Sequence, residues 1–143
     1  MVQAEVAARL GAGPGTRDYG PLAAALALAA TVDRRRDFPP DVFWPRPKVR
    51  SSIVRIRPDP ARRQAHASGP GGWPGLEAFL REAFHHRRKT LRQGLTLAGR
   101  PGPEVSRALA SMGLAEDVRA EAVAPEVLAA LHRRLEDEGG GEK

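Results

Sequence analysis

The sequence contains no cysteine, which excludes a disulfide framework and metal sites built on thiolates. It also lacks the run of ~20 apolar residues that a membrane span needs. Its longest such run, residues 21–30, is only ten residues long and rich in alanine, so it favours a buried helix. The N-terminus does not show the basic, then apolar, then small-residue order of a signal peptide. These absences favour a cytoplasmic protein with no membrane segment.

The sequence has an excess of positive charge, with 23 Lys and Arg against 17 Asp and Glu and a formal net charge of +6. The excess is concentrated: residues 61–95 carry seven Lys and Arg against two acids, whereas residues 96–143 carry six against nine. Concentrated positive charge indicates a polyanionic partner, most often nucleic acid, because binding releases counterions. A general compositional bias toward arginine is the alternative explanation.

The first 60 residues mix helical and extended patterns. Helices are predicted over residues 3–12 and 18–30, the second with Asp18 as its N-cap. Residues 31–38 form a weak strand pattern, and residues 51–58 alternate cleanly and end in a proline, which is typical of an edge strand. Two strands do not make a stable sheet on their own, so we expect them to need further neighbours.

The second half has the pattern of a small helical unit. A stretch rich in Pro and Gly, residues 61–75, is interpreted as a linker between residues 1–60 and a helical domain over residues 76–138, and residues 139–143 are interpreted as a frayed tail. Three helices are predicted in this domain: residues 76–95, Pro103 to Met112, and a last one from Pro125 onward.

The first of these helices contains the stretch AFHHRRKTLRQGL, residues 83–95, in which bases interrupt an apolar repeat. At about 100° per residue, five basic side chains fall within one arc of a helical wheel. Such a line of cations on a rigid helix suits the phosphates of an RNA strand, and the alternative is a solvated amphipathic face. The five residues of this predicted stripe are Arg81, His85, Arg88, Lys89 and Arg92.

Arg87 does not follow the stripe, because the wheel places it in the apolar arc. An unpaired buried guanidinium is too costly, so we predict an ion pair with Glu121.

Other chemistry-bearing motifs are sparse. The adjacent His85 and His86 would point to different faces of a helix, so we predict no metal site. The glycines of residues 11–15 lack the strand before and the helix after them that a phosphate-binding loop needs. No arrangement of nucleophile, base and acid is visible, and we predict no catalytic residue in this chain.

Three stretches together resemble one family: MVQAEVAARL followed by PGTRDYGPL, FPPDVFWPRPKVRSSIVRIRP, and AFHHRRKTLRQGL followed by MGLAEDVRAEAVAPEVLAAL. In this order they are similar to the C-terminal part of the rRNA adenine N6,N6-dimethyltransferases, which modify adjacent adenines near the 3′ end of small-subunit rRNA. The specific motifs are RRKTLR and F-x-P-x-P-K-V-x-S, the latter running from Phe43 to Ser51.

The resemblance implies a Rossmann-like S-adenosylmethionine methyltransferase domain followed by a small helical domain. In the family, the cofactor loop, the acid that holds the cofactor ribose and the Asn-Leu-Pro-Tyr catalytic motif all precede the segment that residues 1–6 resemble. The resemblance therefore places the catalytic motif upstream of Met1. No cofactor-binding residue is expected, and the chain alone is expected neither to bind S-adenosylmethionine nor to methylate RNA.

The fold class expected from the resemblance is an α/β remnant plus an all-α part. The first is the C-terminal part of the methyltransferase domain over residues 1–60, and the second is the helical rRNA-binding domain over residues 76–138.

Some roles follow from the resemblance residue by residue. Phe43 matches the aromatic residue that is expected to lie against the target adenine, although a plain core position beside a proline turn is the alternative. Lys48 of the same motif is also expected to bind RNA. Arg50 stands where the family has an acid. The family's basic helix that faces rRNA is matched by Arg87, Arg88, Lys89 and Arg92.

The expected partner is small-subunit rRNA within a pre-30S-type particle, bound by a monomer. Two alternatives remain open. An erythromycin-resistance-type methyltransferase acting on large-subunit rRNA shares the F-x-P-x-P motif. A non-catalytic RNA-binding or ribosome-assembly module would need only the basic stripe.

Overall fold

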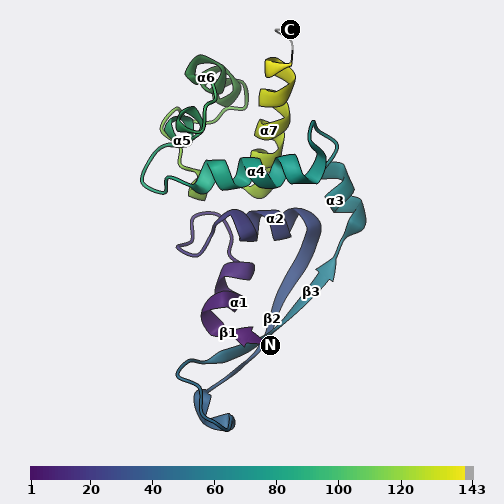
Figure 1. Ribbon diagram of the computed structural model, residues 1–143, viewed down its shortest axis with the longest axis vertical. Coiled ribbons are helices and arrows are strands. Elements are labelled where there is room, and N and C mark those ends of the chain that lie inside the picture. The colour runs from purple at the N-terminus through teal and green to yellow at the C-terminus, as the bar shows by residue number, and fades with distance from the viewer. Residues whose placement is uncertain (141–143) are drawn as a thin grey trace.

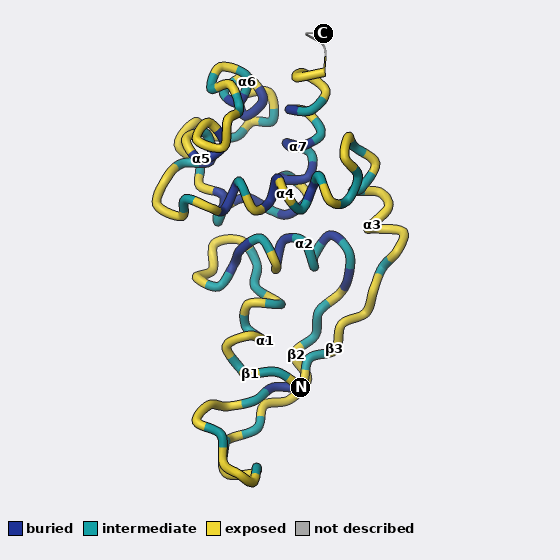
Figure 2. Tube along the Cα trace, in the orientation of Figure 1, coloured by how far each residue is buried: buried dark blue, intermediate teal, exposed yellow. Residues whose placement is uncertain are grey.

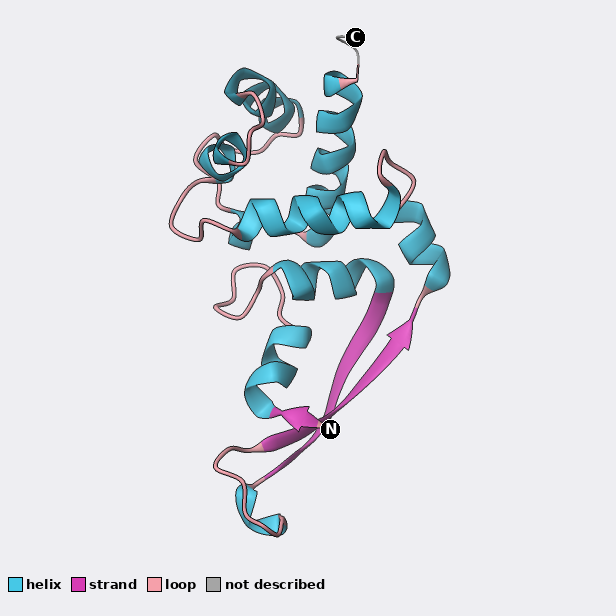
Figure 3. Ribbon diagram, viewed as in Figure 1, coloured by secondary structure: helices cyan, strands magenta, loops and turns pink. Residues whose placement is uncertain are grey.

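The computed structural model describes residues 1–140, in which a group of helices lies at one end and a long β-ribbon extends toward the other (Figures 1 and 3). The first part contains β1 (Val2–Gln3), α1 (Ala4–Leu10), α2 (Pro21–Ala29), β2 (Ala30–Phe38), the 3-10 turn η1 (Pro40–Val42) and β3 (Ser51–Pro58). The second contains α3 (Pro60–His66), α4 (Gly72–Phe84), α5 (Leu91–Leu97), α6 (Gly102–Ser111), the 3-10 turn η2 (Ala120–Ala122) and α7 (Pro125–Gly139).

The sheet has three antiparallel strands in the order β1-β3-β2. β2 and β3 pair along their whole length, with a bulge between Arg34 and Arg36, whereas β1 pairs only through its two residues. The prediction of an edge strand at residues 51–58 is therefore wrong, because β3 is the middle strand. The outer edge of β2 has no partner strand among residues 1–140.

The predicted helices of the first part are confirmed, but one of the expected caps is wrong. α2 begins at Pro21, and its N-cap residue is Gly20 rather than Asp18. Proline at the first helical position explains this start, since its ring fixes a helical φ and its missing N–H would have no intrahelical partner there.

The Pro/Gly-rich segment predicted as a linker is partly helical. Asp59 caps α3 by accepting a hydrogen bond from the Arg62 backbone N–H at 3.0 Å, and Pro60 occupies the first turn. α4 then starts at Gly72, four residues before the predicted helix. At the C-terminus, α7 continues through Gly139, so the predicted fraying of that residue is wrong, and residues 141–143 lie outside the described part of the chain.

The core lies at the helical end and joins the two halves of the sequence (Figure 2). Tyr19, just before α2, packs edge-to-face on Phe84 of α4 at 5.3 Å between ring centroids. Its hydroxyl donates to the Val123 carbonyl at 2.8 Å, and burial raises the pKa of Tyr19 well above its ordinary value. Side chains on both sides of the 61–75 segment thus share one apolar cluster: Ala23, Ala24 and Leu28 with Leu76, Phe79, Leu80, Leu95, Leu109, Leu128 and Leu131.

The ribbon of β2 and β3 is largely outside this core. Ile53 is 38% exposed and Ile56 is 44% exposed, and because they are three residues apart in β3 their side chains point to opposite faces of the ribbon. The described residues therefore leave an aliphatic side chain partly uncovered on each face of the ribbon.

His132 of α7 is buried in the helical core, where its ring lies 5.0 Å from that of Phe79. Neither of its ring nitrogens has a hydrogen-bond partner among residues 1–140. Burial lowers the pKa of His132 below its ordinary value of 6.5, partly offset by Glu136, with Arg100 also lowering it. The folded protein therefore favours the neutral imidazole.

This burial predicts a loss of stability in mild acid. Below about pH 6.5 the unfolded chain binds a proton at this histidine that the folded chain resists, so the free energy of unfolding decreases as the pH falls. We expect a lower thermal midpoint at pH 5.5 than at pH 7.5, measured by circular dichroism. The His132→Leu chain should lose much of this difference, and an equal pH dependence in both chains would contradict the assignment.

None of the helices within residues 1–140 combines the length and apolar character needed to cross a membrane.

Candidate nucleic-acid interface

The basic segment is not a single helix. α4 ends at Phe84, the chain makes a turn closed by a hydrogen bond from the Lys89 N–H to the His86 carbonyl at 3.0 Å, and α5 begins at Leu91. The predicted helix over residues 76–95 is therefore wrong in its middle, and the stripe based on it does not form.

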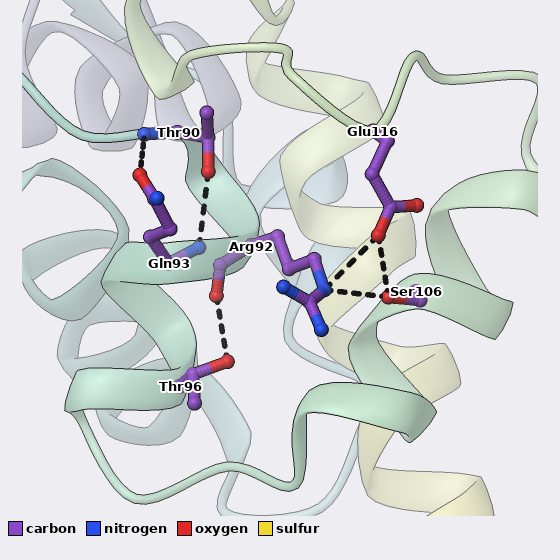
Figure 4. A network of polar contacts seen from close by, with 6 residues as sticks. All are labelled: Thr90, Arg92, Gln93, Thr96, Ser106 and Glu116. Carbon is purple, nitrogen blue, oxygen red and sulfur yellow. Dashed lines mark hydrogen bonds and ion pairs between the residues drawn. The ribbon is translucent and has the colours of Figure 1, made fainter.

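A capping box at Thr90 explains the break (Figure 4). The Thr90 hydroxyl accepts a hydrogen bond from the Gln93 N–H, and the Gln93 side-chain oxygen accepts one from the Thr90 N–H, both at 3.1 Å. This pair satisfies two donors that the first turn of a helix would leave unpaired. The motif Thr-x-x-Gln therefore starts a new helix within an apolar pattern that is continuous by periodicity.

Removing this cap should lower stability by a modest amount. A Thr90→Ala chain is expected to lose about 1 kcal/mol of unfolding free energy, because the N-terminal donors of α5 lose a partner. Thr96→Ala is the matched control, since the Thr96 hydroxyl only donates back to the Arg92 carbonyl within α5. Urea denaturation of both chains measures the difference, and equal losses would contradict the role of the cap.

The turn between α4 and α5 presents adjacent cations to solvent. Arg87 and Arg88 occupy its two central positions, and Lys89 follows. All three residues are exposed, and none forms an ion pair with any residue between 1 and 140. His85, at the end of α4, and Arg81, one turn earlier, are also exposed and line a shallow cleft between α4 and α5.

Arg92, by contrast, is already paired. Its Nε atom lies 2.7 Å from the Ser106 hydroxyl on α6 and 3.0 Å from a carboxylate oxygen of Glu116, and the Ser106 hydroxyl donates to the same carboxylate at 2.8 Å (Figure 4). This network joins α5, α6 and the loop that follows. The structure therefore pairs Arg92 with the carboxylate of Glu116, whereas the predicted stripe left Arg92 unpaired and facing solvent.

The predicted ion pair between Arg87 and Glu121 does not form. Arg87 donates from Nη2 to the Tyr19 carbonyl at 3.3 Å, while Glu121 lies 3.9 Å from Arg119. The helical wheel placed Arg87 in the apolar arc only because the wheel assumed that α4 continues beyond Phe84. In the turn, Arg87 is exposed and connects the helical part to the segment before α2.

The second candidate region is the loop between β2 and β3, at the far end of the ribbon from α6 and α7 (Figure 1). Phe43 is half-buried there, and its ring packs edge-to-face on Phe38 at 6.4 Å. The guanidinium of Arg36 lies 5.1 Å from the centre of the Phe38 ring. Lys48 is exposed in the same loop. The predicted RNA-binding residues therefore form two separate groups, one at the α4–α5 turn and one at this loop.

One aromatic residue of this loop was missed by the sequence reasoning. Trp44 is 96% exposed, far more than any other large apolar side chain among the described residues. The sequence signal was an aromatic pair within a Pro-rich segment that also carries cations.

A cleft of about 800 Å³ was missed as well. Arg9 of α1, Arg17 of the following loop and Arg87 of the α4–α5 turn all line it, together with Glu5 and Asp18. Arg9 is bound to Glu5 at 2.7 Å, whereas Arg17 has no ion-pair partner among residues 1–140. The cleft shows that arginines distant in sequence come together beside the turn.

The start of the chain bears on the catalytic motif that is expected upstream of Met1. Met1 is itself an exposed residue directly before β1, whose two residues pair with Ser51 and Ser52 of β3. The Met1 side chain lies outside the apolar core. The position of the catalytic motif stays a prediction.

The glycine-rich loop of residues 11–15 does not have the setting of an S-adenosylmethionine-binding loop. The glycines of residues 11–15 connect α1 to α2, so they follow a helix. A dinucleotide-type loop instead follows the carboxyl end of a strand. Within residues 1–140, no group of three or more His, Cys, Asp or Glu side chains is placed to hold a metal ion.

Solved structures share this fold. A dimethyladenosine transferase from Plasmodium falciparum superposes with a TM-score of 0.73 at 20% identity, covering 90% of this chain and 53% of that one. The 23S rRNA methyltransferase ErmE superposes with a TM-score of 0.57 at 25% identity, covering 93% of this chain and 52% of that one. The first likeness, at this low identity, concerns the fold alone.

Relatives found by sequence define the class of protein more closely than the shared fold does. The chain is 43% identical over 123 residues to the ribosomal RNA small subunit methyltransferase A of Deinococcus radiodurans, covering 86% of this chain and 40% of that protein. It is 42% identical over 137 residues to the protein of the same name from Acidobacterium capsulatum, covering 96% of this chain and 47% of that protein. The family described as ribosomal RNA adenine dimethylase matches residues 1–137.

The chain therefore belongs to the ribosomal RNA adenine dimethylase family. It spans less than half the length of these two relatives.

Proposed function

We propose that this chain supplies the rRNA-binding part of a small-subunit rRNA adenine N6,N6-dimethyltransferase. The observation that carries the proposal is the α4–α5 turn, where Arg87, Arg88 and Lys89 are exposed and form no ion pair with described residues. Adjacent unpaired cations in a tight turn are suited to the phosphates of a folded RNA. The names of the relatives from Deinococcus radiodurans and Acidobacterium capsulatum support small-subunit rRNA over large-subunit rRNA.

The individual roles differ between the two groups of residues. Arg88 and Lys89 contact RNA phosphates directly, and Arg81 and His85 extend this surface along α4. Lys48 binds phosphate at the β2–β3 loop, and Phe43 provides an apolar platform for the target adenine, since a base removed from its stack needs such a surface. Arg92 plays no direct part in this proposal, because Glu116 and Ser106 already hold its guanidinium.

The same proposal assigns residues 1–60 to the C-terminal part of a Rossmann-like methyltransferase domain and residues 76–138 to the helical rRNA-binding domain. The partly exposed Ile53 and Ile56 of β3 support this assignment, because the helices that pack on both faces of such a sheet would cover them. In the whole enzyme, S-adenosylmethionine would supply the methyl group. The residues that bind this cofactor would lie outside this chain. The whole enzyme would act in the cytoplasm as a monomer on a pre-30S-type particle.

A complementation assay tests the proposal. The chain alone is expected to transfer no methyl group from labelled S-adenosylmethionine to small-subunit rRNA. Adding the separately produced N-terminal portion of the Deinococcus radiodurans relative, which ends where the match to this chain begins, should restore N6,N6-dimethyladenosine formation.

Three outcomes would contradict this assignment. Methyl transfer by the chain alone would mean that it holds a complete site. Crosslinking to large-subunit rather than small-subunit rRNA would favour the erythromycin-resistance-type alternative. Binding to small-subunit rRNA without restored activity would favour the non-catalytic module.

A further inference from the structure

Trp44 is presented to solvent at the apex of the β2–β3 loop. At 96% exposure, its indole ring makes almost no contact with the described residues, whereas the neighbouring Phe43 packs on Phe38. Of the two adjacent aromatic residues, one therefore stabilises the loop and the other is free. Tryptophan carries a large apolar surface that folded proteins usually bury or use for binding.

The backbone that carries Trp44 is restricted. Pro39, Pro40, Pro45 and Pro47 fix four φ angles of the loop, and the η1 turn is closed by a hydrogen bond from the Phe43 N–H to the Pro40 carbonyl at 3.2 Å. A partner that meets the ring therefore orders little additional chain, which lowers the entropic cost of binding.

The charges around the ring indicate the chemistry of the partner. Arg46, Lys48 and Arg50 are exposed in the same loop, and none forms an ion pair among residues 1–140. Asp41 is the one acid between residues 39 and 50. A partner with flat apolar faces and a regular anionic backbone matches this surface, and single-stranded RNA has both features.

We propose that Trp44 stacks on an unpaired base of an RNA strand whose phosphates contact Arg46, Lys48 and Arg50. This base is distinct from the adenine assigned to Phe43, because the half-buried Phe43 ring packs on Phe38 whereas the Trp44 ring is 96% exposed. The inference rests on the proposed rRNA-binding function and adds an unpaired nucleotide beside the target as a determinant of recognition.

Tryptophan emission tests the stacking directly, because the chain has only two tryptophans, Trp44 and Trp73. Trp73 reports on the first turns of α4, where its indole N–H donates to Glu77 at 2.6 Å and its ring lies under Arg63. Titration with a single-stranded oligoribonucleotide of ten adenosines is expected to quench the unchanged chain and the Trp73→Phe chain. The Trp44→Phe chain, which keeps Trp73, should show almost no quenching while still binding the oligonucleotide by anisotropy.

Affinity gives a second readout. Trp44→Ala should weaken oligonucleotide binding by about tenfold, the range expected for one lost base–aromatic contact, whereas Trp44→Phe should keep most of the affinity. Thermal midpoints of both variants should equal that of the unchanged chain, because the ring contributes nothing to the core.

The outcomes separate this proposal from the function on which it rests. Binding of the oligonucleotide by the Trp73→Phe chain with unchanged emission would overturn the stacking and leave the proposed function intact. An equal response to a ten-base-pair RNA duplex would also overturn it, since only the two terminal pairs of a duplex have a free face for the ring. Trp44 emission that responds to the N-terminal portion of the Deinococcus radiodurans relative but not to RNA would assign the ring to a protein contact. No binding of any RNA would overturn both.

Discussion

A Phe79→Ala chain is expected to lose about 3–5 kcal/mol of unfolding free energy, measured by urea denaturation. Phe79 is completely buried in the middle of α4, and its ring lies 5.0 Å from that of His132 and 5.3 Å from the guanidinium carbon of Arg100. Truncation would leave a cavity under Arg100, which pairs with Glu82 at 3.2 Å and Glu136 at 2.9 Å. The substitution thus removes apolar burial and the support of an ion-pair network together.

Leu97→Ala is the matched control for this prediction. Leu97 is 58% exposed on α5, so its truncation should change the free energy of unfolding by no more than about 0.5 kcal/mol. A typical domain has only ~5–15 kcal/mol in total, so Phe79→Ala should leave the chain close to unfolding at moderate temperature. Similar losses in the two variants would show that the α4–α7 contact is not the centre of the core.

The second large effect concerns RNA binding. A chain with Arg88→Glu and Lys89→Glu should bind small-subunit rRNA at least ~10-fold more weakly at moderate salt, because two phosphate contacts become repulsive. The slope of the logarithm of affinity against the logarithm of salt concentration should also decrease, by about 0.7–0.9 for each contact that is lost. Filter binding at several salt concentrations measures both quantities.

The control for this variant carries the same change in charge elsewhere. Arg35→Glu with Arg107→Glu alters exposed positions on β2 and α6, away from the turn and without ion pairs among residues 1–140, so the salt slope should be nearly preserved. Equal salt slopes for the two double variants would mean that the turn affects RNA affinity only through the net charge of the chain. Arg92 is unsuitable for either chain, because reversing its charge would place two carboxylates together at Glu116.

The sequence predicted most elements because their signals were local. Alternation identified β3, and prolines in first turns identified α6 and α7. Gly113, with a φ of +71°, follows the C-cap residue of α6 and ends that helix. The break between α4 and α5 was missed because apolar periodicity continues through it. The deciding signal was the capping box of Thr90 and Gln93, which is local but weaker than the periodicity.

The candidate site was less predictable because tertiary partners decide it. Nothing in the wheel shows that Glu116, 24 residues after Arg92, folds back to meet it, or that Arg87 reaches a carbonyl near the N-terminus. Arg88 and Lys89 remain predicted RNA-binding residues, and their exposure is consistent with that role. The exposure of Trp44 depends on Phe43 taking the contact with Phe38, which composition alone cannot reveal.

The outer edge of β2, which has no partner strand among residues 1–140, has a consequence for self-association. A long strand with free N–H and C=O groups is a template for edge-to-edge pairing between copies, and neighbouring aliphatic residues would strengthen such a contact. In this chain the edge carries three consecutive arginines, residues 34–36, and the bulge in the same place distorts the hydrogen-bonding row. Two copies would have to bring these charges together before their strands could pair. The positive charge of these arginines therefore opposes aggregation along β2.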